Sequence, residues 1–222
     1  MWLWLLFQLQ LPAPVGYVND FAGVIRPEVA TRMDGIIREV RSKSGGEIAV
    51  VTLRDLGGRS PEEVALRIGR EWGVGARGGA GDRARNAGVV ILLKPGARPG
   101  DGQSEIRVET GLGAEGWLTD AQAGRIRDAI GGAAVQSGRF DDGLLVGVRL
   151  VAEAYAREFG FELTGVPTGP EPRTPRSSPG GSIGLLVLIA FLIFAAMAGS
   201  AGGGRGGRYR RRGSSLNWLL WS

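Results

Sequence analysis

Cysteine and histidine are both absent from the 222-residue chain. Without thiols, disulfide frameworks, cysteine-ligated zinc sites and cysteine nucleophiles are excluded. Without imidazole, the chain lacks the commonest general base and metal ligand, so serine–histidine catalysis and histidine-rich metal sites are excluded as well. Carboxylate and amide oxygens remain, and these are the ligands that Ca²⁺ and Mg²⁺ prefer.

The folded part of the chain also lacks an excess of positive charge. The formal net charge is +5, but the region before residue 166 holds 20 basic and 21 acidic residues. The basicity therefore belongs to the C-terminal part, and no basic groove for nucleic acid is expected. The seven C-terminal arginines are Arg173, Arg176, Arg205, Arg208, Arg210, Arg211 and Arg212.

Composition divides the chain into five segments. We expect a signal-like apolar leader (1–15), a folded domain (16–163), a Pro/Gly/Ser linker (164–182), a transmembrane helix (183–201) and a Gly/Arg-rich tail (202–222). The uncharged run at 183–199 has 17 residues. Such a run spans about 25 Å as a helix, close to the lower limit for a bilayer core of about 30 Å.

The alternative for this run, a buried core helix, has no adjoining domain to bury it. The arginines that follow it predict a cytoplasmic C-terminus and an extracytoplasmic domain, and hence a single-pass protein of the cell membrane. The leader agrees with export, whether it is cleaved or stays as a second anchor.

Hydrophobic periodicity predicts the elements of the domain. Helices are expected after Pro27, after Ser60, after Thr119 and around Leu144 to Phe159, with strands at 48–53, 89–93 and 106–109. Their order, α-β-α-β-β-α-α, indicates an α/β fold: a three-layer α/β/α sandwich with a mixed sheet. The first two strands should be parallel, and the second and third should form an antiparallel pair.

The most informative segment is residues 104–121, where an alternating strand runs into a G-x-G-x-x-G loop (111–116) and then a capping box. The predicted topology brings this loop and Asn86 to one end of the sheet. Asp141 and Asp142 should lie at the opposite end, as a helix N-cap and its neighbour.

A strand, a glycine loop and a helix in this order could bind a dinucleotide, but that interpretation is weak here. No acidic residue ends a strand about 20 residues further on, as ribose binding requires. A nicotinamide cofactor is therefore not expected. The same backbone freedom could instead serve a cation, since Glu115, Asp120 and Asn86 supply oxygen ligands. The structural alternatives are a loop acid for Glu115, a helix first-turn charge for Asp120, and support of the first helix for Asp20.

Several short motifs together resemble the TPM domain family. They are residues 18–25, 46–52, 72–75, 86–89, 106–121 and 140–143. The resemblance covers roughly residues 16–161 and includes the architecture, because bacterial TPM proteins carry a secretion signal, the domain, one transmembrane helix and a glycine-rich tail.

The resemblance implies an α/β/α sandwich, often with Ca²⁺ near the loop ends. Related domains occur in a thylakoid lumen factor described as an acid phosphatase and in an accessory protein of neurotransmitter receptors. The acidic positions of the family fall on Asp20, Glu115 and Asp120. This chain departs from the family at Asn86, where Asp is common, and that loss should weaken a cation site.

Two functions follow from these observations. The first is a membrane-anchored accessory or scaffold module of the envelope, with an unidentified protein partner and a Ca²⁺ or Mg²⁺ site at Asn86, Glu115, Asp120 and Asp20. The second is a metal-assisted phosphatase in which an acid-bound cation polarises a phosphoryl oxygen.

Overall fold

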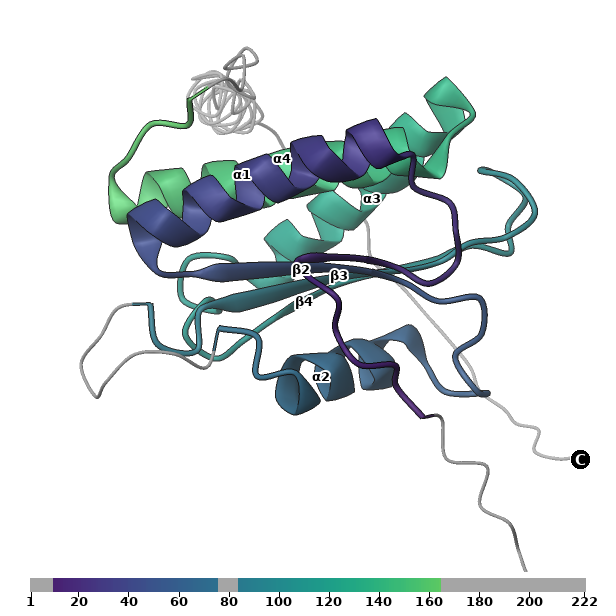
Figure 1. The fold of residues 1–222 in the computed structure, drawn as a ribbon, viewed down its shortest axis with the longest axis horizontal. Helices are drawn as coiled ribbons and strands as arrows, with labels where there is room; N and C mark the ends of the chain where they lie inside the picture. The colour runs from purple at the N-terminus through teal and green to yellow at the C-terminus, as the bar shows by residue number, and fades with distance from the viewer. Residues whose placement is uncertain (1–9, 76–83, 165–222) are drawn as a thin grey trace, which may run out of the picture. The chain divides into compact units, whose positions relative to one another are not determined.

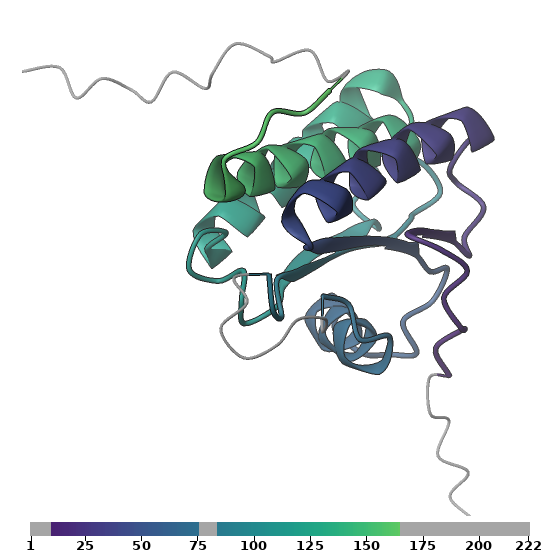
Figure 2. The same ribbon diagram turned by 60° about the vertical axis from the view of Figure 1, so that its left-hand side comes forward.

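The computed structural model describes residues 10–75 and 84–164 of the chain. They form a mixed four-stranded sheet with four helices, and α1, α3 and α4 cover the face opposite to α2 (Figures 1 and 2). The elements are β1 (Val18–Asp20), α1 (Pro27–Ser44), β2 (Glu47–Thr52), α2 (Pro61–Glu71), β3 (Gly88–Lys94), β4 (Glu105–Thr110), α3 (Asp120–Ser137) and α4 (Phe140–Phe159).

The predicted strand directions are confirmed. The sheet order is β1-β2-β3-β4, with β1, β2 and β3 parallel and β4 antiparallel to β3. A helix joins β1 to β2 and another joins β2 to β3, whereas β3 and β4 are consecutive. Helical crossovers return the chain to the same end of the sheet, and this makes the first three strands parallel.

The sheet separates two hydrophobic layers. Alternate residues of β3 divide between them: Val89, Ile91 and Leu93 pack under α1, α3 and α4, whereas Val90 and Leu92 pack against α2. β2 and β3 are therefore buried on both faces, as their continuous apolar runs predict.

One strand, β1, was not predicted. It has only three residues, and two of them, Asn19 and Asp20, are polar and disfavour strands. Asn19 is fully buried, and its side chain accepts a hydrogen bond from the Val15 amide at 2.8 Å and donates one to the Gly16 carbonyl at 2.9 Å. These bonds hold the chain in register beside β2, so the strand depends on tertiary contacts that periodicity does not report.

Asp141 does not cap α4, and the expectation that it would is wrong. Arg139 takes the N-cap position, and the buried Asp141 carboxylate faces α1 instead. It accepts hydrogen bonds from the Arg26 side chain at 2.5 Å and from the Arg26 amide at 3.2 Å. The Arg26 side chain makes no capping hydrogen bond at the start of α1. Instead, the Arg26 amide at this helix end donates to the Asp141 carboxylate, which lies 115 residues away in the sequence.

The apolar run at 183–199 lies outside the described residues. No helix in the described ranges has the length and hydropathy needed to cross a bilayer.

The Arg26–Asp141 pair makes stability depend on pH. Burial alone would raise the pKa of Asp141, but the hydrogen bonds and charge of Arg26 outweigh it and hold that pKa below its ordinary value. A carboxyl with a lowered folded-state pKa stabilises the fold above its unfolded pKa, and this stabilisation disappears as the pH falls through the folded value.

We predict that Asp141→Asn lowers the free energy of unfolding by about 1.5–3 kcal/mol at pH 7, because it removes a charged hydrogen-bond partner. The difference from the parent should shrink below about pH 4, near the pKa of an unfolded Asp. Urea unfolding at several pH values measures both effects. Asp128→Asn, in an exposed ion pair with Arg127, is the matched control and should change stability by less than about 0.5 kcal/mol. An equal loss in both variants would contradict this role for Asp141.

Candidate functional site

The glycine loop after β4 lies directly on the turn before β3. The Gly111 amide donates to the Gly88 carbonyl at 2.8 Å, and the Gly113 amide donates to the Asn86 carbonyl at 3.0 Å. A Cβ atom on Gly111 would lie 2.4 Å from the Asn86 oxygen, and one on Gly113 would lie 2.1 Å from the Arg85 oxygen. Only glycine allows two backbones to approach so closely.

This contact decides which groups the loop can offer a ligand. The amides of Gly111 and Gly113 donate to protein carbonyls, and the Ala114 amide donates to the Gly111 carbonyl at 2.8 Å. The glycines therefore serve packing between β3 and β4, not a cradle of outward amides for a pyrophosphate. The first two glycines of the G-x-G-x-x-G loop therefore have a structural explanation, whereas nothing lies within 4 Å of the Cβ position of Gly116.

The turn before β3 has an unusual backbone at Asn86. Its φ of 58° is the only left-handed value at a non-glycine position in the described ranges. Asparagine tolerates this conformation better than most residues. The exposed side chain of Asn86 thereby projects outward while its carbonyl holds Gly113.

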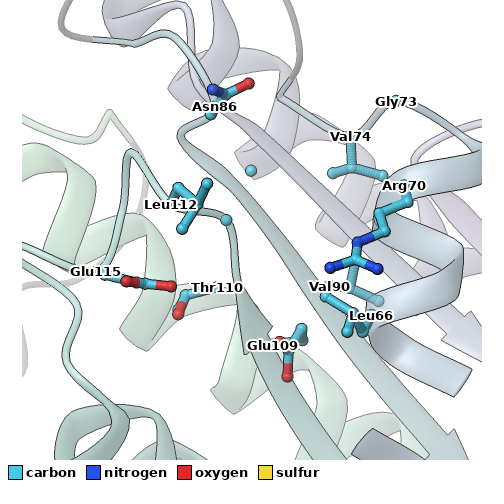
Figure 3. Close-up of a pocket in the computed structure, with 13 residues that line it drawn as sticks. Leu66, Arg70, Gly73, Val74, Asn86, Val90, Glu109, Thr110, Leu112 and Glu115 are labelled. Carbon is cyan, nitrogen blue, oxygen red and sulfur yellow. The ribbon is translucent and has the colours of Figure 1, made fainter. Parts of the chain in front are cut away.

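A cleft of about 410 Å³ opens where this turn, the end of β4 and α2 meet (Figure 3). Arg70 reaches toward it from the last turn of α2, whereas Glu109, Thr110 and Glu115 line the side formed by β4 and its loop. The apolar part of the wall consists of Leu66, Val74, Val90 and Leu112.

The charges in the cleft differ in their freedom to bind a ligand. Glu109 is engaged, because its carboxylate lies 2.7 Å from the Arg107 guanidinium. Glu115 is exposed and forms no ion pair or side-chain hydrogen bond with any described residue, and the same holds for Arg70. Among the residues that the structure describes, the cleft thus offers one unpaired carboxylate, Glu115, and one unpaired guanidinium, Arg70.

The structure brings two of the four predicted ligands together. Asn86 and Glu115 line the cleft, as the topology predicts. Asp120 is exposed at the first residue of α3 and does not line it. Across the described ranges, no group of three or more acidic side chains is arranged to hold a metal ion.

Asp20 lies at the other end of the sheet and does not share a site with the other three. β1 is parallel to β3, so Asp20 ends its strand far from the residues that begin β3. Its carboxylate accepts hydrogen bonds from the Thr52 hydroxyl at 2.6 Å and from three amides of the β1–α1 loop at 2.9–3.1 Å. Asp20 therefore supports the loop that leads into the first helix, as the structural alternative to a metal ligand predicts.

The sequence did not identify Glu109, Thr110 and Arg70 as lining residues. Glu109 could have been found, because it is on the outward face of the alternating strand. Arg70 could not, because its position depends on how α2 lies across β3 and β4.

The TPM domain model matches residues 18–154, more than half of the chain. The chain belongs to the TPM domain family. Among solved structures, it is similar to the N-terminal domain of a P. gingivalis protein, with 30% identity and a TM-score of 0.53 over 66% of this chain and 86% of that one. The N-terminal domain of a Corynebacterium glutamicum protein is 19% identical, with a TM-score of 0.46 over 67% and 85%. The comparison with curated proteins gave no match.

We predict that Gly113→Ala destabilises this TPM domain by about 1–3 kcal/mol, because the added methyl group collides with backbone that cannot move aside. Gly116→Ala is the control in the same loop, since nothing lies within 4 Å of its Cβ position. Thermal unfolding of the two variants measures the difference. Equal melting temperatures would show that the loop is not held against the turn.

Proposed function

We propose that this chain is a membrane-anchored, extracytoplasmic accessory module of the cell envelope that binds Ca²⁺ weakly at the Asn86 end of its TPM domain. Asn86 and Glu115 offer side-chain oxygens in the cleft that Thr110 also lines, and Asp120, at the first residue of α3 outside the cleft, completes the proposed set. Asp20 has no part in the site, because its oxygens already accept four protein hydrogen bonds.

The observation that carries this proposal is the contact of the glycine loop with the Asn86 turn. It brings the exposed side-chain amide of Asn86 and the exposed carboxylate of Glu115 to one cleft. The described part of the chain leaves Glu115 and Asp120 without ion pairs, so their oxygens are available to a hard cation.

The charge of the donor set argues for weak binding. Two carboxylates and an amide carry less charge than the sites of high-affinity calcium proteins, and Arg70 adds an opposing positive charge. Calcium sites of extracellular modules have dissociation constants of about 10⁻⁴–10⁻³ M, and we assign this site to that range.

The anchored topology rests on sequence outside the described residues. The apolar run at 183–199, the arginines after it and the neutral domain support a single span with a cytoplasmic C-terminus. The absence of histidine and cysteine removes the usual nucleophile–base pairs and favours an accessory role over catalysis.

One observation favours the second candidate, a metal-assisted phosphatase. Arg70 and Glu115 line the same cleft, so a guanidinium could hold a phosphoryl group beside a cation held by the carboxylate. A water or a carboxylate would complete the chemistry in that case.

Calcium binding is tested by thermal unfolding and calorimetry on the full chain in a neutral detergent. We expect Ca²⁺ at about tenfold its Kd to stabilise the domain by about 1.4 kcal/mol. Glu115→Gln should weaken binding by about tenfold or more, whereas Glu28→Gln, an exposed acid of the first turn of α1, should leave it unchanged. No stabilisation at millimolar Ca²⁺ would remove the site.

The same preparation separates the two functions. We expect no turnover of a generic phosphate ester with Ca²⁺ or Mg²⁺. Metal-dependent hydrolysis that is lost in Asp120→Ala would contradict the accessory role and support the phosphatase.

The topology has its own test. A tag placed after Ser222 should be protected from protease in intact cells and become accessible after permeabilisation. Accessibility in intact cells would reverse the orientation.

A further inference from the structure

A second cleft lies at the end of the sheet opposite to Asn86. It has a volume of about 670 Å³ and is lined by the loops that follow β1, β2 and β3 and by the turn between α3 and α4. In open α/β sheets, ligands bind in the crevice outside the carboxyl ends of the parallel strands. All three parallel strands of this domain end here.

Four arginines from four separate segments line this cleft. They are Arg26 after β1, Arg54 after β2, Arg98 after β3 and Arg139 before α4. The Arg26 guanidinium is already paired within the protein, because it lies 2.5 Å from the Asp141 carboxylate and 2.7 Å from the Asp142 carboxylate. The cleft also contains Asp141, whose charge is used in that pair.

The other three arginines are exposed and form no salt bridge within the described ranges. Arg54 bends over the β1–α1 loop, where its guanidinium lies 3.5 Å from the Cβ position of Gly23. Arg98 interacts electrostatically with Asp101, whose carboxylate accepts hydrogen bonds from the Gln103 and Arg98 amides at 2.9 and 3.2 Å. Three guanidinium groups thus retain donors for a ligand.

The backbone of the β1–α1 loop cannot bind an anion in their place. The amides of Gly23, Val24 and Ile25 already donate to the Asp20 carboxylate. This loop would otherwise form an anion-binding nest, and Asp20 fills it. At this loop, an external anion must therefore be held by side chains.

We infer that Arg54, Arg98 and Arg139 form a binding site for a phosphate group. The guanidinium fork matches phosphate oxygens in pairs, and a phosphate monoester offers enough oxygens and negative charge for several forks at once. A single carboxylate has two oxygens and one charge, so it satisfies the cleft less well. The site binds without hydrolysis and lies at the other end of the sheet from the proposed Ca²⁺ site, on which it does not depend.

The test is calorimetric titration of the full chain in neutral detergent with inorganic phosphate and with phenyl phosphate at low salt, where the charges are least screened. We expect Arg54→Gln and Arg139→Gln each to weaken binding by about tenfold, the loss of one charged hydrogen-bond donor. Arg127→Gln, an exposed arginine of α3 paired with Asp128, is the control and should bind as the parent does.

Circular dichroism of each variant checks that the fold persists. Phosphate binding that is equal in the parent and both variants, or no binding at all, would overturn the proposal. Binding of a glutamate-rich peptide as tight as that of phosphate would also overturn it, because the site would then select charge alone.

Two further titrations distinguish the sources of the phosphate group. Vesicles containing phosphatidic acid, compared with phosphatidylcholine alone, report a lipid headgroup, and inorganic phosphate reports a soluble ligand. Arginine-dependent binding in either arm supports the site and identifies its source. Binding to phosphatidic acid vesicles that persists in the double variant Arg54→Gln/Arg139→Gln would contradict it.

Discussion

The contact between the glycine loop and the Asn86 turn is the constraint on which the cleft depends. Two backbone hydrogen bonds join the end of β4 to the start of β3, and neither loop glycine in the contact can carry a side chain. These bonds continue the β3–β4 ladder beyond the strands and fix the loop against the turn. The exposed oxygens of Asn86 and Glu115 then lie along one cleft instead of on independent loops.

The parallel strands give the domain two chemically different ends. At the amino end of β3, the cleft offers the Asn86 side-chain amide and the Glu115 carboxylate, with the Arg70 guanidinium opposite. At the carboxyl ends of β1, β2 and β3, the carboxylates of Asp20 and Asp141 accept hydrogen bonds from the protein itself. Three of the arginines that line this cleft remain available to a ligand. The Ca²⁺ site and the phosphate site that we propose therefore lie at separate ends of the sheet.

Much of the fold could be predicted from the sequence, because its determinants are local. Periodicity located the four helices and three of the strands, the Ser60 cap is formed at 3.1 Å, and the short β3–β4 connection set their antiparallel pairing. β1 was missed because the buried bonds of Asn19 stabilise it, not its strand propensity. The contact of Asp141 with Arg26 spans 115 residues, so no local pattern could distinguish it from a cap.

The candidate site was predictable only in part. The element order placed Asn86 beside the glycine loop. Because β1 was not predicted, the sequence did not show at which end of the sheet Asp20 lies. Arg70 enters the cleft through the packing of α2 on β3 and β4, which depends on the whole core. The arginine cleft could not be predicted for the same reason, since its residues come from three loops after strands and from the α3–α4 turn, and they meet only in the folded domain.

The central claim is that the Asn86 end of the TPM domain binds a cation through oxygens that the glycine loop aligns. The most direct measurement is a Ca²⁺ titration of the ¹⁵N-labelled full chain in detergent, followed by amide chemical shifts. The account predicts saturable shifts confined to residues 85–88, 109–116 and 120, with the amides of Arg54 and Arg139 unchanged. Saturable shifts at the arginine end, or none at the Asn86 end, would contradict it.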